Sequence, residues 1–282
     1  MSCIKELLDA SSLDKVDAKV LLQYLIDKHL SWPKSSLISR NTDPLPEALI
    51  LEWHLLESRR LAGEPVAYIL GKKEFYNIEL KVAPGVLIPR PETELLVEIA
   101  IEHIHQRAFD HPKILDLGTG SGAIALAIAK NIPHATITAV DLSSEAIDIA
   151  KNNAQLLNVL SRTHFYQGSW FEALPHASHQ HYFDLIVSNP PYIAAGDHHL
   201  VTGDLRFEPS SALTDSQDGL SAYRDIIAHA KTYLNDDGMI ALEHGYDQSA
   251  AVTQLLKEFS FKDIKVHHDL AGIARAASAK LS

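Results

Sequence analysis

The sequence is poor in cysteine and has no long apolar segment. Only Cys3 is a cysteine among 282 residues, so no internal disulfide can form and we expect a reducing compartment. The longest stretch without Asp, Glu, Lys or Arg covers residues 117–129, which is shorter than the roughly 18 residues that a membrane span needs. The first residues show no basic segment followed by an apolar one, so we expect no signal peptide and a cytoplasmic protein.

An excess of basic residues is also missing. Residues 1–90 contain twelve basic and twelve acidic residues, whereas residues 91–282 contain thirteen and twenty-four, which places the whole net charge of −11 in the second segment. Surfaces that bind nucleic-acid phosphates usually have a basic bias. The composition therefore argues against nucleic acid as a direct partner, although the pairs Arg59-Arg60 and Lys72-Lys73 leave local patches open.

A metal-ligand pattern is absent although sixteen histidines are present. His176, His179 and His181 lie close together in the sequence, but no cysteine and no helical H-x-x-x-H pattern accompanies them. We therefore expect solvated loop histidines and no metal.

The pattern of apolar residues divides the chain into three parts. Residues 1–65 show two helical stripes, the first after Asp17 as the expected N-cap. Residues 66–91 predict a hairpin and a proline-rich linker, since Ile78, Leu80 and Val82 alternate with charged residues. The two stripes consist of Val20, Leu21, Tyr24 and Leu25, and of Leu45, Leu49, Trp53 and Leu56.

Residues 92–282 predict an α/β fold with a mixed, mainly parallel sheet covered by helices on both faces. Short apolar strands alternate with helical segments along this part of the chain, which is typical of a parallel sheet. The tail, around residues 264–268 and 274–279, is expected to supply edge strands. The expected strands are ILDL (114–117), TITAV (136–140), FDLIVS (183–188) and MIALE (239–243).

A glycine-rich turn follows the first of these strands and precedes an apolar helix over 123–129. Glycines allow the backbone to turn tightly and to approach a ligand closely. Asp141 ends the next strand, where an acid can accept hydrogen bonds from both hydroxyls of a ribose, or serve as a helix N-cap. The expected cofactor contacts in the turn are Gly118, Thr119, Gly120, Ser121 and Gly122.

The spacing of these glycines favours S-adenosylmethionine over a dinucleotide. The turn is G-x-G-x-G, one residue shorter than the dinucleotide fingerprint G-x-G-x-x-G. S-adenosylmethionine has a ribose and an adenine but no phosphate, and Asp116 is an acid that can attract its ammonium or sulfonium charge.

The motif Asn189-Pro190-Pro191-Tyr192 follows the strand FDLIVS and is the expected chemical centre. A planar amide or exocyclic amine is a poor nucleophile, because its lone pair is delocalised. The Asn189 side-chain oxygen and the Pro190 carbonyl can accept from its two N–H bonds, two prolines hold the backbone rigid, and Tyr192 can stack on the planar group. Most of the catalysis would come from placement and polarisation.

These motifs together resemble class I S-adenosylmethionine-dependent methyltransferases and, more narrowly, the protein-(glutamine-N5) methyltransferases of the HemK/PrmC type, which modify peptide chain release factors. NPPY is shared with nucleic-acid amino-methyltransferases, whereas GEPVAYILG and IPRPETE restrict the family. The matching stretches, which cover nearly all of the chain, are residues 59–75, 86–98, 114–129, 139–154, 188–193, 206–213 and 242–248.

The resemblance implies roles for further residues and partners. Trp170 matches the position that flanks the adenine, although an aromatic residue here can also belong to the core. Asn189 would contact both cofactor and substrate, Asn189 to Tyr192 would hold the glutamine side chain, and S-adenosylhomocysteine would be the product. The N-terminal helices would dock the release factor and present the glutamine of its Gly-Gly-Gln motif, with no membrane contact and a monomeric enzyme.

Several alternatives remain open at this stage. A glutamine of a release factor is the leading prediction for the acceptor, a glutamine of a ribosomal protein is its nearest rival, and a nucleic-acid base is less favoured. The intact NPPY motif argues against a non-catalytic use of the cofactor pocket. Arg90, Glu92 and Glu208 are expected either to line the crevice or to form ion pairs at the surface.

Overall fold

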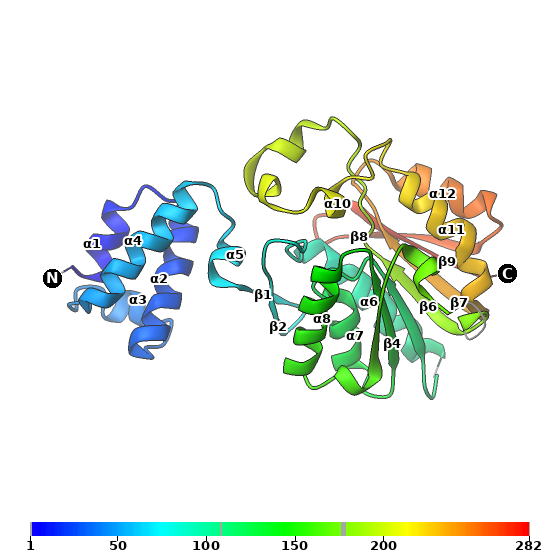
Figure 1. Cartoon of the computed structure of the whole chain (residues 1–282), viewed down its shortest axis with the longest axis horizontal. Coiled ribbons are helices and arrows are strands. Elements are labelled where there is room, and N and C mark those ends of the chain that lie inside the picture. The colour runs from blue at the N-terminus through cyan, green and yellow to red at the C-terminus, as the bar shows by residue number, and fades with distance from the viewer. Residues whose placement is uncertain (1, 108, 176–178, 282) are drawn as a thin grey trace. The chain divides into compact units, whose positions relative to one another are not determined.

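The computed structural model describes residues 2–107, 109–175 and 179–281. The chain divides into two compact units that separate between Lys72 and Lys73. The first unit is helical (Figure 1). Its helices are α1 (Ile4–Ala10), α2 (Lys15–Leu30), α3 (Ser36–Ser39), α4 (Glu47–Leu61) and α5 (Val66–Leu70).

Helices α2 and α4 form the core of the first unit. The expected stripes are largely confirmed, because Leu21, Leu25, Leu49 and Trp53 are fully buried. Val20 departs from its stripe and is 42% exposed.

The expected N-cap of α2 at Asp17 is wrong. The helix begins one turn earlier, since the Asp14 side chain accepts a hydrogen bond from the Val16 amide at 2.8 Å. Asp17 lies inside the helix and forms an ion pair with Arg60 at 2.7 Å.

A two-stranded hairpin follows, formed by β1 (Lys72–Phe75) and β2 (Ile78–Lys81). Tyr76 and Asn77 connect the strands and both have positive φ, at 43° and 62°, as a tight hairpin turn requires. The predicted alternation in β2 is confirmed, because Ile78 and Leu80 are buried while their neighbours are exposed.

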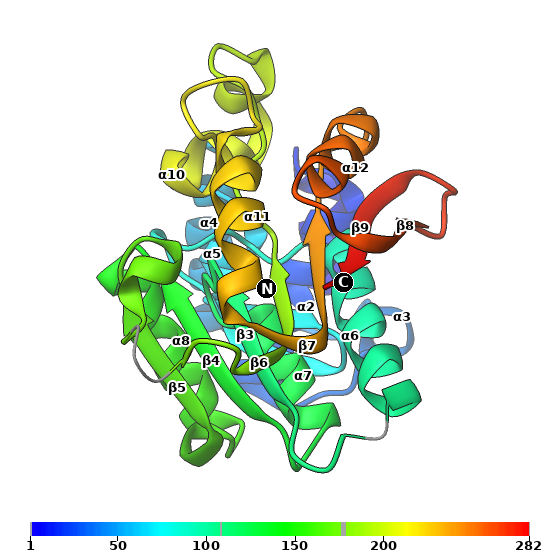
Figure 2. The ribbon, with the colours of Figure 1, turned by 90° about the vertical axis from the view of Figure 1, so that its right-hand side faces the viewer.

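The second unit contains a seven-stranded sheet in the order β5-β4-β3-β6-β7-β9-β8 (Figure 2). Strands β3 to β7 are parallel, and β9 pairs antiparallel with both β7 and β8, so the predicted mixed, mainly parallel sheet is confirmed. The strands are β3 (Lys113–Leu117), β4 (Thr136–Asp141), β5 (Thr163–Gln167), β6 (Phe183–Ser188), β7 (Leu234–Glu243), β8 (Lys262–His268) and β9 (Ala274–Lys280).

Helices cover both faces of this sheet (Figures 1 and 2). On one face, residues of α6, α7 and α8 share an apolar core with Ile114 and Val187, and on the other, residues of α11 and α12 share a core with Leu115 and Ile186. The helices are α6 (Glu94–Arg107), α7 (Ala123–Asn131), α8 (Ser144–Leu156), α10 (Ser210–Leu213), α11 (Ser221–Tyr233) and α12 (Ser249–Glu258). The 3-10 helices are η1 (Pro91–Thr93), η2 (Leu160–Arg162), η3 (Trp170–Ala173), η4 (His198–Val201) and η5 (Gly203–Phe207).

The strands of this sheet contribute apolar residues to the cores on both of its faces. Adjacent residues of a strand point to opposite faces, so a strand covered on both sides reads as a continuous apolar run, as ILDL and LIVS do. Among the described residues, no helix has both the length and the apolar character needed to cross a membrane.

Candidate active site

Four parallel strands bring the predicted site residues to one edge of the sheet. Leu117 pairs with Val140 and with Ser188, and Ser188 pairs with Leu242. The glycine turn, Asp141, Asn189 and Glu243 therefore follow or end neighbouring strands at their carboxyl ends. This edge is where open α/β sheets bind ligands.

A cavity of about 700 Å³ opens at this edge, a volume that suits a small-molecule ligand. Gly118, Gly120, Asp141, Trp170 and Asn189 line it, together with residues 85–87 of the segment after the hairpin. Its far wall is formed by Pro209, Ser211, Ala212, Thr214, Asp215, Ser216 and Gln217, and by Ser221, Ala222 and Asp225 of α11.

The charge of the cavity is negative. Three carboxylates, those of Asp141, Asp215 and Asp225, belong to its lining, and no Lys or Arg does within the described part of the chain. A cationic ligand fits this lining better than a phosphate does, because opposite charges attract and phosphates are usually met by basic side chains or amide nests. The donor set thus fits S-adenosylmethionine, whose sulfonium and ammonium groups are cationic.

Within the glycine turn, Gly118 and Gly120 line the cavity, whereas Thr119, Ser121 and Gly122 do not. A Cβ at Gly120 would have no atom within 4 Å, whereas one at Gly122 would lie 2.8 Å from Leu126 Cδ1. Thr119 and Ser121 are buried, and the Ser121 carbonyl accepts from Asn153 Nδ2 at 2.9 Å. The turn therefore has a cavity side and a core side.

Asp116 is enclosed behind the turn. It has no exposed surface, and its Oδ2 accepts from Thr119 Oγ1 at 2.7 Å and from the Ala125 amide at 3.2 Å. Burial raises the pKa of this carboxyl to about 7. Asp116 thus joins the turn to the start of α7, and its side chain does not line the cavity.

Asp141 fixes the turn from the neighbouring strand. Its Oδ2 accepts from the Gly120 amide at 2.8 Å, and its Oδ1 accepts from the Ser143 amide at 2.9 Å. Ser143 is itself the N-cap of α8, since its hydroxyl accepts from the Ala146 amide. Desolvation raises the pKa of Asp141, and the carboxyl lines the cavity beside Gly118 and Gly120.

The Trp170 ring lies beside the glycine turn, next to Gly118. Its ring atom Cζ3 would be 3.5 Å from a Cβ at Gly118, and its backbone has a φ of 40°. A positive φ is strained for a bulky residue, and such strain is often found at binding sites. The ring both lines the cavity and packs against the apolar core beneath it.

The NPPY motif is divided between the cavity and the core. Asn189 and Pro191 line the cavity, while Pro190 is buried. Tyr192 is partly buried against the core, and burial raises the pKa of its hydroxyl to about 12. The Tyr192 carbonyl accepts from Gln248 Nε2 at 2.9 Å, which holds the end of the motif.

Two residues that the sequence reasoning did not single out contact Asn189. Its Nδ2 donates to Thr93 Oγ1 at 3.1 Å, and its side chain also hydrogen-bonds to the buried carboxyl of Glu243. Glu243 is an acidic residue at the end of the apolar strand MIALE, and this position could have indicated a functional role from the sequence. Thr93 gave no comparable signal.

Arg90 and Glu208 form an ion pair, but Glu208 is buried rather than at the surface. Its carboxylate also accepts from the Ile88 amide at 2.9 Å. The pair therefore anchors the segment whose residues 85–87 line the cavity. Neither Arg90, Glu92 nor Glu208 lines the cavity itself.

The histidine clusters have structural partners where they are described. His179 is buried among Tyr182 and Phe183, contrary to the expected solvated position, because its ring packs against these aromatic rings. His181 Nδ1 lies 3.0 Å from the Leu234 carbonyl, and His176 falls outside the described residues. In the described ranges no group of three or more His, Cys, Asp or Glu could hold a metal ion.

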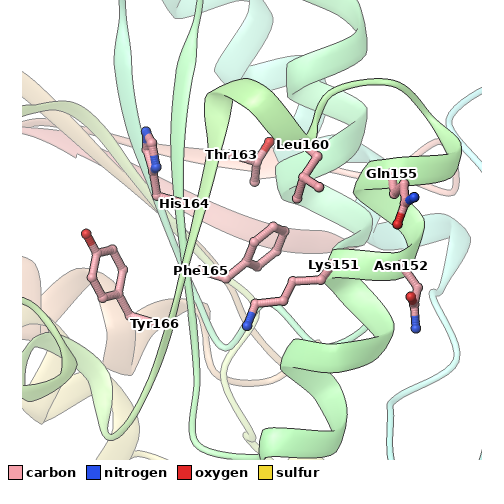
Figure 3. Close-up of a pocket in the computed structure, with 8 residues that line it drawn as sticks. All are labelled: Lys151, Asn152, Gln155, Leu160, Thr163, His164, Phe165 and Tyr166. Atoms are coloured by element: carbon pink, nitrogen blue, oxygen red, sulfur yellow. The ribbon is translucent and has the colours of Figure 1, made fainter.

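A second hollow of about 390 Å³ lies between α8 and the edge strand β5 (Figure 3). Phe165 and Lys151 face one another there, whereas His164 and Tyr166 point to the opposite side of the strand. None of the predicted site residues belongs to its lining. We therefore assign the chemistry to the larger cavity.

The class of protein follows from the fold and a family model. A model described as a methyltransferase domain matches residues 108–275. The solved N-terminal domain of human METTL16 in complex with SAH has the same fold, with a TM-score of 0.52 and 16% identity over 79% of this chain and 82% of that one. The second unit is thus a class I S-adenosylmethionine-dependent methyltransferase domain, as its sequence predicted.

The particular family is given by closer relatives. The release factor glutamine methyltransferase of Bordetella pertussis is 45% identical over 281 residues, which is 100% of both chains. That of Burkholderia pseudomallei is 46% identical over 280 residues, or 98% of this chain and 95% of its own. A model described as the PrmC N-terminal domain also matches residues 2–71. The chain belongs to the family of release factor glutamine methyltransferases, which confirms the resemblance seen in the sequence.

Proposed function

We propose that this protein methylates the side-chain amide nitrogen of the glutamine in the Gly-Gly-Gln motif of peptide chain release factors. The observation that carries the proposal is the position of Asn189. Its side chain lies at the cavity that Gly120 and Asp141 line, with its Nδ2 bonded to Thr93. A polar acceptor stands at this point where a methyl donor and a planar amide can meet.

The glutamine amide nitrogen is a weak nucleophile, and the residues of this chain compensate by holding it in the orientation that the reaction needs. The Asn189 Oδ1 and the Pro190 carbonyl accept from the two N–H bonds of the glutamine amide, and the adjacent prolines limit backbone motion. The amide plane is then held with one lobe of the nitrogen toward the methyl donor. The nitrogen–carbon bond would form as the sulfur–carbon bond breaks, and the nitrogen would release one of its two protons. Placement and polarisation of this kind supply most of the rate enhancement.

S-adenosylmethionine, when bound, supplies a methyl group on a cationic sulfur. Asp141 would accept from its ribose, Gly118 and Gly120 would allow close backbone approach, and Trp170 would flank its adenine. The three cavity carboxylates favour its positive charge. The proposal includes a monomeric enzyme that uses no metal and binds no nucleic acid directly.

The choice of substrate draws support from the relatives, which are named for release factors and match the whole chain. The helical first unit would dock the release factor, a role in keeping with the family model over residues 2–71. A glutamine of a ribosomal protein is the competing acceptor, and the experiment below includes it.

The test is methyl transfer from labelled S-adenosylmethionine to purified release factor, with ribosomal proteins and total RNA as competing acceptors. We expect label on the glutamine of the Gly-Gly-Gln motif and loss of at least about a hundredfold in kcat for Asn189→Ala, since one lost polar contact at a reacting group costs this much. S-adenosylhomocysteine should bind the variant within about threefold of wild type. Label on another acceptor, with none on the release factor, would disprove the proposal.

A further inference from the structure

The orientation of the Asn189 side chain decides whether it can act. An asparagine amide has an acceptor end and a donor end of nearly the same shape, and only the network around it distinguishes them. The proposed reaction requires Oδ1 toward the cavity, because an NH2 group there would repel the N–H bonds of the substrate amide. A device that fixes this orientation is therefore required.

Thr93 and Glu243 stand on the side of Asn189 away from the cavity. Ser188 of β6 pairs with Leu242 of β7, so Asn189 and Glu243 leave neighbouring strands side by side. Thr93 ends η1 and is 4% exposed, and Glu243 is 3% exposed. Neither residue lines the cavity.

The three side chains lie next to one another and interact. Asn189 Nδ2 donates to Thr93 Oγ1 at 3.1 Å, and hydrogen bonding with Thr93 and Asn189 lowers the pKa of the neighbouring Glu243 carboxyl against the effect of burial. The second oxygen, Glu243 Oε2, is buried and has no partner in the part of the chain that the structure describes.

The carboxyl group of Glu243 determines which of the neighbouring groups donate hydrogen bonds and which accept them. In its ionised form, above a pKa of about 7, the Glu243 carboxyl can only accept, so the Thr93 hydroxyl then donates its hydrogen to Glu243. The Thr93 oxygen then has only lone pairs left for Asn189, which must present Nδ2 to it. The Nδ2 group of Asn189 is thereby held on the buried side by Thr93, and Oδ1 is left for the cavity.

We propose that Glu243, acting with Thr93, is a positioning residue that turns the acceptor end of Asn189 toward the substrate. This inference rests on the proposed function and names what orients its central group. A carboxylate is costly to bury, and burial raises the pKa of Glu243 to about 7. A neutral side chain of the same size would be cheaper for the fold, so a role in orientation accounts for an acid here.

The main test compares Glu243→Gln with wild type. Glutamine keeps the size of the side chain but can donate as well as accept, so it no longer determines which groups donate and Asn189 can turn over. We expect kcat for release-factor methylation to fall at least about tenfold, with S-adenosylhomocysteine affinity and the KM for release factor within about threefold. The melting temperature should not fall, because a buried charge has been removed.

Thr93 provides a matched pair. Thr93→Val keeps the shape and loses the hydroxyl, whereas Thr93→Ser keeps the hydroxyl. We expect Thr93→Val to lower kcat, and Thr93→Ser to retain most of the activity that Thr93→Val loses. Glu258→Gln, at the end of α12, is the control for a Glu to Gln change away from the cavity.

Each outcome decides between the two proposals. If wild type methylates the release factor and Glu243→Gln has the same kcat, the positioning role is rejected while the proposed function stands. Equal losses of kcat, cofactor affinity and melting temperature would show a merely structural role and also reject it. If wild type transfers no methyl group to the release factor, the proposed function fails and this inference fails with it.

Discussion

Asp141 both holds the glycine turn in place and lines the cavity. Its two oxygens accept from the Gly120 and Ser143 amides, and its carboxyl lines the cavity. We expect Asp141→Asn to weaken S-adenosylhomocysteine binding about ten- to a hundredfold, because hydrogen bonds to a charged acceptor are worth more than neutral ones. Isothermal titration calorimetry measures this, with Asp148→Asn on the exposed side of α8 as the control. Equal affinity in the two variants would contradict a cofactor role for Asp141.

Glu243 is the residue whose ionisation should couple stability to pH. Its pKa is raised from 4.5 to about 7, first by burial, with Glu92 adding to the shift and Thr93, Arg275 and Asn189 opposing it. The folded protein therefore holds a proton that the unfolded chain has already released between these two values. The contribution of Glu243 to stability thus falls as pH rises from about 4.5 to about 7, and is unfavourable above that range.

We expect Glu243→Gln to be more stable than wild type at pH 8, by at most about 3 kcal/mol, and the difference to shrink toward pH 5. Urea unfolding at both pH values measures this. A variant less stable than wild type at pH 8 would show that the ionised carboxylate supports the fold instead.

At the scale of elements, one side of the glycine turn between β3 and α7 lines the cavity, and the other side packs against the core. Gly120 and Gly122 both have positive φ, at 56° and 85°, so a side chain at either position is strained. Only Gly122 faces packed atoms, those of Leu126 and Ala150. Gly120 faces open space and lines the cavity.

The two glycines serve as controls for each other. We expect Gly122→Ala to lose more stability than Gly120→Ala, by at least about 1 kcal/mol, because it adds a steric clash to the same backbone strain. Gly120→Ala should weaken S-adenosylhomocysteine binding more than Gly122→Ala does. Denaturant unfolding and calorimetry on both variants check the two orderings, and a reversal of either would refute this division of the turn.

At the scale of the whole molecule, each unit has a core of its own. The two clusters that cover the sheet contain no residue before Phe75, and the cluster of the first unit contains none after Leu70. Residues 73–282 should therefore fold alone. We expect this fragment to bind S-adenosylhomocysteine within about threefold of the full chain while its kcat/KM for intact release factor falls at least about tenfold, since remote contacts with a substrate serve its chemistry.

A short peptide carrying Gly-Gly-Gln is the control for the fragment. It cannot use a remote docking surface, so its kcat/KM should differ much less between fragment and full chain. Equal rates of both proteins on the intact release factor would argue against docking by the first unit.

The sequence predicted those features that depend on neighbours along the chain. The spacing of apolar residues predicted the strands and helices. In a strand every second side chain faces the core, and in a helix every third or fourth does, so this spacing depends only on the local backbone geometry. The order strand, glycine turn, helix placed Gly120 and Asp141 at one sheet edge, and NPPY after β6 placed Asn189 there as well. The N-cap of α2 was misplaced because Asp14 and Asp17 are equally good candidates by residue type.

Tertiary structure alone decided which side chains act on Asn189 and which glycines face the cavity. Thr93, Asn189 and Glu243 are far apart in sequence, and their contact depends on the pairing of β6 with β7 and on the path of the segment before α6. Likewise, the sequence predicted Thr119, Ser121 and Gly122 as cofactor contacts, yet none of them lines the cavity: Thr119 and Ser121 are buried, and Gly122 faces Leu126. Residue type specifies which hydrogen bonds a side chain can make, but only the packing of distant segments determines which partner it meets.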